Sequence, residues 1–217
     1  MPCRAAGRCG WRGAAWMPEA GAALAALAGG WLPGCAVAWA DPARAYPLLP
    51  GEDVTGMVPK RAAEFSAGRH AARLALGAAV AIPKGEDRAP VWPRGVAGSI
   101  THAGGVCLAA VSHERRGIGL DLEPLRALGP ELTALIQNED DRMEDAGDPG
   151  LWLFCAKEAV YKAQYPLTRR ILGPEALAVT IRGGHLTARS REPSAQGGQI
   201  AGRIGVCAGY VLAVAWL

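Results

Sequence analysis

The 217-residue chain lacks several features that mark common protein classes. It has no run of five Lys or Arg residues and no cysteine pair in a C-x-x-C arrangement, and its net charge is only +3. These absences argue against a general nucleic-acid-binding surface, a zinc site and a redox motif. No stretch reaches the roughly 20 apolar residues that cross a membrane. We therefore expect no nucleic-acid or membrane partner and a cytoplasmic protein with free thiols.

Hydrophobic residues make up 50% of the chain, which is enough to bury one core or two small halves. Helix and strand patterns before and after about residue 112 suggest an α+β fold built from two similar halves, although no repeat is legible in the letters. The expected helices begin at Pro59 and cover 131–145 and 151–165, and the expected strands include 106–111, 178–181, 186–188 and 211–216.

Residues 1–33 allow two interpretations. Three arginines among the first twelve residues precede an apolar stretch at 20–32, and residues 38–40 resemble a signal-peptidase site. Glu19 at the edge of that stretch and the Pro33-Gly34 pair after it favour a packed helix instead, followed by a strand over 35–39.

The segment Gly117–Glu123 has the alternating pattern of a strand buried on one side. Ile118, Leu120 and Leu122 share one face, so Asp121 and Glu123 share the other. Two carboxylates placed this way repel each other unless a cation lies between them, and their oxygens suit Mg²⁺. Taken alone, a solvated strand face explains the pair better.

The segment Phe154–Lys162 has the spacing of a helix. Glu158 and Lys162 lie four residues apart, so a carboxylate and an ammonium group share one helical face. Taken alone, the pair is best explained as a surface ion pair.

Together and in this order, the two segments resemble the signature pair of the 4′-phosphopantetheinyl transferase superfamily. A third element, Gly98-Ser99-Ile100-Thr101-His102, precedes Asp121 by nineteen residues. The pattern from Arg61 to Leu76 and the Trp92-Pro93 pair resemble the branch that includes the enterobactin-synthase activating enzyme. The resemblance implies a pseudo-duplicated fold with an N-terminal half (1–112), a C-terminal half (113–217) and an active site at their junction. Residues 1–33 have no counterpart in it.

The resemblance also implies an activity. Such enzymes transfer the phosphopantetheine arm of coenzyme A (CoA) to a serine of an acyl or peptidyl carrier protein and release adenosine 3′,5′-bisphosphate. It assigns a Mg²⁺ ion to Asp121, Glu123 and Glu158. It places Lys162 on the transferring phosphate, with Lys157 assisting.

For CoA itself, the resemblance assigns the phosphates to Thr101 and His102 and to three basic residues, Arg61, Arg69 and Arg88. Glu139 stands roughly where the family has a proposed general base, but its spacing to Glu158 is short. Glu158 or a metal-bound water is the alternative base.

Two further questions stay open at this level. A homologue that binds CoA or a carrier protein without catalysis is the alternative to an enzyme, but no metal ligand and no signature lysine is missing here. The segment from Tyr165 to Arg170 either docks an acidic carrier protein or simply ends a helix with cations that complement its dipole.

We expect a monomer, because the short trimeric type has chains about half this length.

Overall fold

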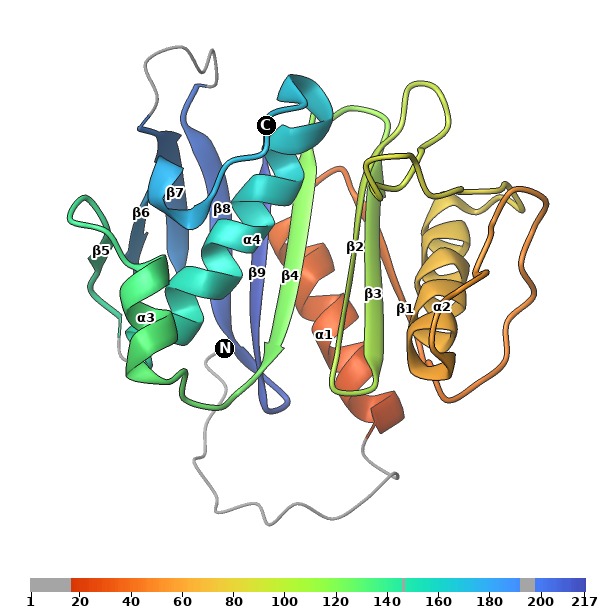
Figure 1. The fold of residues 1–217 in the computed structure, drawn as a ribbon, viewed down its shortest axis with the longest axis horizontal. Coiled ribbons are helices and arrows are strands. Elements are labelled where there is room, and N and C mark those ends of the chain that lie inside the picture. Colours follow the sequence, from red (N-terminus) through yellow and green to blue (C-terminus); the bar gives the residue numbers. More distant parts are fainter. Residues whose placement is uncertain (1–16, 146, 192–197) are drawn as a thin grey trace.

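The computed structural model of the chain describes residues 17–145, 147–191 and 198–217 (Figure 1). In chain order its elements are α1 (Met17–Trp31), β1 (Ala36–Ala40), α2 (Pro59–Leu76), β2 (Ala97–Ala103), β3 (Val106–Ser112), β4 (Ile118–Pro124), α3 (Pro130–Ile136), β5 (Arg142–Met143), α4 (Pro149–Thr168), β6 (Leu177–Arg182), β7 (His185–Ser190), β8 (Ile200–Cys207) and β9 (Tyr210–Trp216). A 3₁₀ turn at Pro174–Ala176 precedes β6. The expected α+β class is confirmed.

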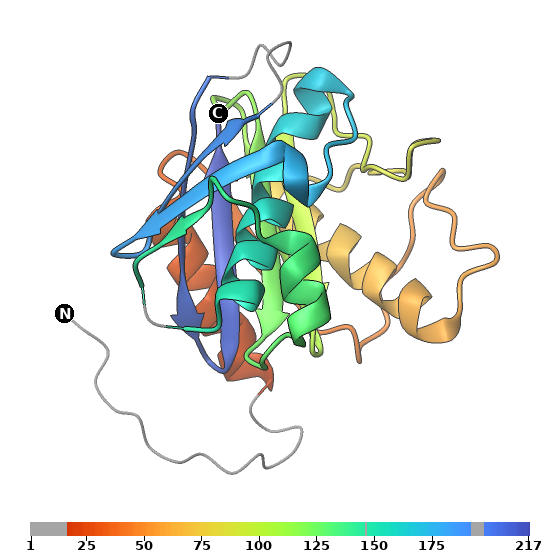
Figure 2. The same cartoon turned by 60° about the vertical axis from the view of Figure 1, so that its left-hand side comes forward.

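The strands form a smaller and a larger sheet. The smaller sheet has the order β1-β3-β2 and is antiparallel, and the larger has the order β4-β9-β8-β7-β6-β5. Within the larger sheet only the short β5–β6 pair is parallel. Helix α2 packs on the smaller sheet, and the strands of the larger sheet run between α1 and α4 (Figure 2).

Alternation along the strands explains how the helices are distributed. On β9, Val211 and Ala213 contribute to the core under α4, whereas Leu212 and Val214 face α1. On β3, Leu108 likewise packs against α1. Helix α1 therefore buries apolar residues of both sheets in one cluster, and the two halves share part of their core.

Most of the expected elements are confirmed, including the helix and strand at the N-terminal end of the described residues. The helix expected over 131–145 is wrong beyond Ile136. Gln137 is extended (φ −76°, ψ 137°), and the backbone N–H of Asn138 donates instead to the Asp141 carboxylate at 2.9 Å. This side-chain contact competes with continued helix formation.

Strands β2 and β8 were not anticipated, because small and polar residues interrupt their apolar pattern. The arginines of the export-signal interpretation lie outside the described residues. No helix in the described ranges is long and apolar enough to cross a bilayer.

Candidate active site

Strand β4 and helix α4 approach each other unusually closely because two glycines of β4 face the helix. A Cβ at Gly119 would lie 1.7 Å from the carbonyl oxygen of Ala159, and one at Gly117 would lie 2.2 Å from that of Ala163. The next residue on the same face of β4 is Asp121. The absence of side chains at the two glycines therefore brings Asp121 within reach of polar residues on α4.

Asp121 is the centre of this contact. The Lys162 ammonium group donates to Asp121 Oδ1 at 2.6 Å and to the Leu120 carbonyl at 3.0 Å, and Thr101 Oγ1 lies 3.4 Å from the same Oδ1. Asp121 is only 5% exposed, and its Oδ2 is buried without a hydrogen-bond partner among the described residues. A buried carboxylate oxygen is costly to leave unpaired, so this atom is available to a ligand.

Glu123 and Glu158 add negative charge beside Asp121. Burial raises the pKa of Glu123, and the charge of Asp121 raises that pKa further. Burial also raises the pKa of Glu158, while Lys162 acts in the opposite direction. The strand face shared by Asp121 and Glu123 is therefore not the solvated face that the simpler interpretation expects. The helical spacing of Glu158 and Lys162 is confirmed within α4.

A second polar group comes from the N-terminal half. His102 on β2 lies beside Arg61 and Glu64 on α2, with His102 Nε2 bonded to Arg61 and His102 Nδ1 3.3 Å from the Glu64 carboxylate. Arg61 also lies 3.6 Å from that carboxylate. Burial and the charge of Arg61 lower the pKa of His102, although Glu64 opposes this shift.

Strand alternation separates Thr101 from His102, although they are adjacent in the sequence. Thr101 faces Asp121, and Ser99 on the same face accepts a hydrogen bond from the Leu120 N–H at 2.9 Å. His102 points to the opposite face, toward α2. Thr101 therefore contacts the Asp121 carboxylate and helps to orient it at the junction of the two sheets.

A cavity of about 240 Å³ adjoins Lys162. Its lining includes the aromatic side chains of Trp92, Tyr161 and Tyr165, and it also includes Arg88. The loop that carries Arg88 also contacts α4 directly, because Asp87 accepts hydrogen bonds from Tyr165 and Arg169, each at 2.9 Å. Sequence reasoning missed this aromatic lining. Tyr161 and Tyr165, four residues apart on one helix, were the available signal.

Arg69 of α2, expected at the CoA phosphates, is packed into the core. It is 6% exposed, its Nε donates to the Ile82 carbonyl at 2.9 Å, and its guanidinium group stacks 4.0 Å from the Phe65 ring centre. Burial lowers the pKa of Arg69 to about 10, which leaves the group charged at neutral pH. Its contacts are those of a structural residue, whereas Arg61 on the same helix reaches His102.

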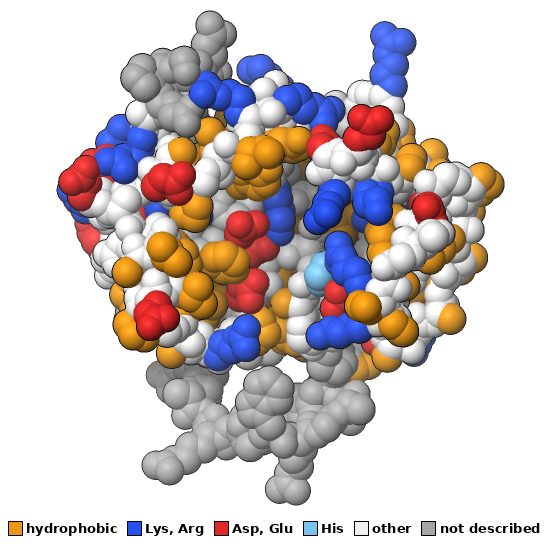
Figure 3. All heavy atoms as spheres, in the orientation of Figure 1, with side chains coloured by type: hydrophobic (Ala, Val, Ile, Leu, Met, Phe, Trp, Pro, Cys, Tyr) orange, Lys and Arg blue, Asp and Glu red, His pale blue; other side chains and the backbone are white. Residues whose placement is uncertain are grey.

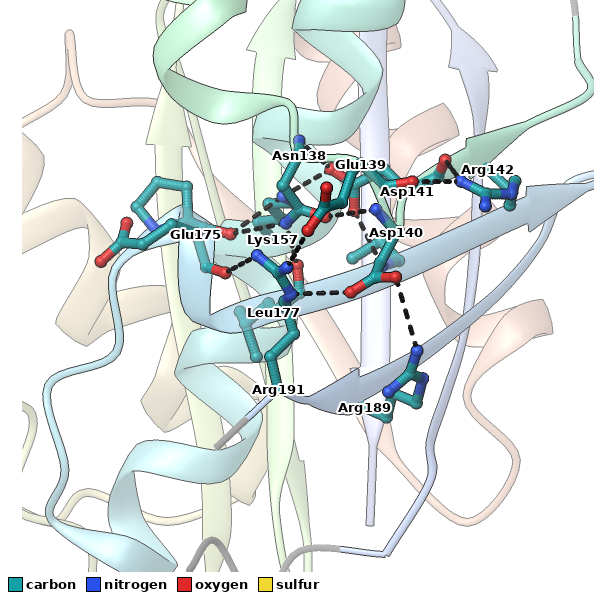
Figure 4. Close-up of polar contacts among 12 residues, drawn as sticks. Asn138, Glu139, Asp140, Asp141, Arg142, Lys157, Glu175, Leu177, Arg189 and Arg191 are labelled. Atoms are coloured by element: carbon teal, nitrogen blue, oxygen red, sulfur yellow. Dashed lines mark hydrogen bonds and ion pairs between the residues drawn. The ribbon is translucent and has the colours of Figure 1, made fainter. Parts of the chain in front are cut away.

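Lys157 and Glu139 belong to a different cluster, shown in Figure 4. Lys157 is 3% exposed and donates to Asp141 at 2.7 Å and to the carbonyls of Ile136 and Pro174. Successive helical residues point about 100° apart, so Lys157 cannot share a direction with Glu158. Glu139 pairs at 2.8 Å with Arg191, and its side chain is 83% exposed. The structure brings neither residue to Asp121.

The donor chemistry of the acidic group fits a divalent cation. Asp121 Oδ2 is orphaned, and burial together with the negative charge of Asp121 raises the pKa values of Glu123 and Glu158. The described residues contain no preassembled group of three acidic, His or Cys ligands. Mg²⁺ does not require one, because it is commonly bound by one or two carboxylates together with water and substrate phosphates.

Acidic and basic side chains meet near the middle of the face in Figure 3, where a histidine lies beside several Lys or Arg side chains. Carboxylates and cations thus face a shared region at the junction of the halves. An arrangement of this kind can hold a phosphorylated ligand through its cations and a metal ion through its acids.

Comparison with known proteins agrees with this geometry. The profile of the 4′-phosphopantetheinyl transferase N-terminal domain matches residues 35–112, and that of the 4′-phosphopantetheinyl transferase superfamily matches residues 117–215. The two matched regions correspond to the two halves of the expected fold, which is thereby confirmed.

Individual relatives point the same way. The chain is 44% identical to the 4′-phosphopantetheinyl transferase Npt of Nocardia iowensis over 57% of this chain and 61% of that protein. It is 38% identical to PptT of Mycobacterium tuberculosis over 66% of this chain and 69% of that protein. Enterobactin synthase component D of Salmonella austin is 36% identical over 48% of each chain. The chain therefore belongs to the 4′-phosphopantetheinyl transferase superfamily.

Proposed function

We propose that the protein transfers the 4′-phosphopantetheine arm of CoA to a serine of an apo acyl or peptidyl carrier protein and releases adenosine 3′,5′-bisphosphate. The observation that supports this most directly is the contact of Lys162 with Asp121 beside an orphaned carboxylate oxygen. In the reaction the serine oxygen bonds to the phosphorus that bears the pantetheine arm. The bond from that phosphorus to the bridging pyrophosphate oxygen breaks, and the serine proton passes to a base.

The cations have distinct tasks in this proposal. Lys162, held by Asp121 and the Leu120 carbonyl, presents its ammonium group to the transferring phosphate. Arg61 and His102 bind a CoA phosphate from the N-terminal half, and Arg88 contributes from the lining of the cavity. Positioning and charge neutralisation account for most of catalysis in phosphoryl transfer, and these side chains supply both.

Asp121, Glu123 and Glu158 would hold a Mg²⁺ ion. When bound, that ion neutralises charge on the pyrophosphate and on the leaving phosphate. The chain's own contribution is to keep three carboxylates beside Lys162, with Thr101 and the ammonium group orienting Asp121.

For the general base we propose Glu158. It lies on α4 one turn before Lys162, which is proposed to contact the transferring phosphate. Glu139 is a weaker candidate because its carboxylate pairs with Arg191 in the separate cluster around Lys157.

We further propose that the pantetheine arm enters the cavity beside Lys162, where the aromatic side chains can pack against its methyl and methylene groups. We also propose a monomer as the working unit, because the length of the chain is that of the two-half type and not of the short trimeric type. The substrates, CoA and an apo carrier protein, support a cytoplasmic location.

Mass spectrometry of an apo carrier protein incubated with the protein, CoA and Mg²⁺ tests the proposal. We expect the mass of one phosphopantetheine to be added. The gain should disappear with Asp121→Ala or with excess chelator, while Glu19→Ala on the exposed side of α1 should behave as wild type. Undiminished transfer by Asp121→Ala would refute the site. CoA binding without any transfer by wild type would identify a non-catalytic homologue.

A further inference from the structure

Glu64 lies behind the two residues proposed to bind a CoA phosphate. Its side chain is 17% exposed, against 33% for His102 and 48% for Arg61. Its carboxylate lies 3.3 Å from His102 Nδ1 and 3.6 Å from the Arg61 guanidinium group. The more exposed pair therefore faces solvent, while the carboxylate contacts both from the protein side.

The contacts decide which ring nitrogen of His102 carries the proton. A guanidinium group can only donate, so Nε2, which contacts Arg61, must accept. A neutral imidazole has a single N–H, which must then be on Nδ1, where it donates to Glu64. Without Glu64, Nδ1 would lose its acceptor and Arg61 its carboxylate partner, so a single contact from a less restrained Arg61 would have to hold the ring.

The backbone fixes Glu64 in this place. It follows Arg61 by three residues on α2, so both side chains lie on one helical face. The Glu64 carbonyl accepts a contact from the Cys107 thiol of β3, directly across from His102 in the sheet register. Helix α2 and the β2–β3 pair thus hold the carboxylate opposite Nδ1.

We propose that Glu64 is a positioning residue for CoA binding: it holds His102 through Nδ1 and steadies Arg61, so that the guanidinium group and the ring, which takes up a proton at Nε2, both donate to a phosphate of CoA. This inference rests on the proposed function. Besides Arg61 and Glu64, the charged groups that act on His102 are Lys162 of α4 and Asp121 of β4. Neither of these two is bonded to the imidazole ring in the described structure, so Glu64 and Arg61 hold its orientation.

Nitrogen-15 NMR of the ligand-free protein tests the tautomer directly. We expect wild-type His102 to carry its proton on Nδ1, Glu64→Gln to keep this tautomer through its amide oxygen, and Glu64→Leu to give a mixture. An unchanged Nδ1–H tautomer in Glu64→Leu would overturn the proposal, whether or not the protein turns over CoA.

Steady-state kinetics provide the second readout. Glu64→Leu should raise KM for CoA roughly five- to thirtyfold with kcat within about twofold, and Glu64→Gln should have a smaller effect. In a His102→Ala background, Glu64→Leu should add little, because its main partner is gone. Glu19→Leu on α1 is the matched control, and melting temperatures show whether each variant is folded.

The kinetic outcomes separate this inference from the proposed function. Wild-type protein that neither binds CoA nor transfers its arm would refute the proposed function. If wild type is active but KM for CoA is unchanged in Glu64→Leu, the role of Glu64 is refuted and the proposed function stands. The same holds if the changes in KM of Glu64→Leu and His102→Ala are fully additive in the double variant.

Discussion

Substituting Gly119 by alanine tests whether close packing of β4 on α4 builds the site. The added Cβ would lie 1.7 Å from the Ala159 carbonyl oxygen and 2.8 Å from the Ala163 nitrogen, and both are backbone atoms that no side-chain rotation can move. Ordinary contact begins at 3.4 Å, so strand and helix would have to separate by about 1.7 Å at this point.

The expected cost follows from this displacement. Overpacking a core typically costs 1 to 3 kcal/mol, and the rigid obstacle here indicates roughly 3 kcal/mol or more. For a chain of this size that loss lowers the melting temperature by about 6 to 12 °C. Because α4 also carries Glu158 and Lys162, a shift of about 1 Å should reduce kcat by on the order of a hundredfold.

Thermal unfolding followed by circular dichroism, together with the carrier-modification assay, measures both effects. Gly29→Ala is the matched control, because nothing lies within 4 Å of a Cβ at that position of α1. It should stabilise the protein by roughly 0.5 to 1 kcal/mol, as alanine does in a helix. A Gly119→Ala protein with the melting temperature and activity of wild type would refute the packing argument.

Three other predictions follow from residues outside the acidic group. Arg69→Met should lower the melting temperature but leave KM for CoA unchanged, because the guanidinium group is buried against Ile82 and Phe65; a large rise in KM by kinetics would contradict this. Lys157→Met should cost roughly 3 to 5 kcal/mol in urea unfolding, because the buried Asp141 carboxylate would lose its only cationic partner among the described residues, and CoA affinity by calorimetry should not change. Burial raises the pKa of the Cys107 thiol to about 12 and raises the pKa of the Cys155 thiol well above its usual value. Both thiols should resist iodoacetamide at pH 8 in the native state and react in urea, as peptide mapping would show. Raised thiol pKa values leave little thiolate until the pH approaches them, so native labelling at pH 8 would mean that burial is incomplete.

The sequence determined the local parts of the site. Alternation placed Asp121 and Glu123 on one strand face, and helical spacing placed Glu158 and Lys162 on one helix face, because these periods depend only on backbone geometry. The two signatures, taken together, also identified the family, and the structure places Lys162 directly on Asp121.

Only the tertiary structure decided which basic residues reach the junction. Arg61 and Arg69 lie on one helix and look equivalent in the sequence, but the turn that carries Arg69 packs into the core, whereas the first turn of α2 lies beside His102. Lys157 and Glu158 are adjacent in the sequence, but helical rotation directs Lys157 to Asp141.

Sequence pattern was also insufficient for the strands. The hydrophobic pattern did not reveal β2, although alternation along this strand directs Thr101 to Asp121 and His102 to Glu64. The close approach of β4 to α4 depends on the absence of a side chain at Gly119, which becomes meaningful only when the opposing helix is known. Periodicity fixes which residues share a face, but long-range packing decides what each face meets.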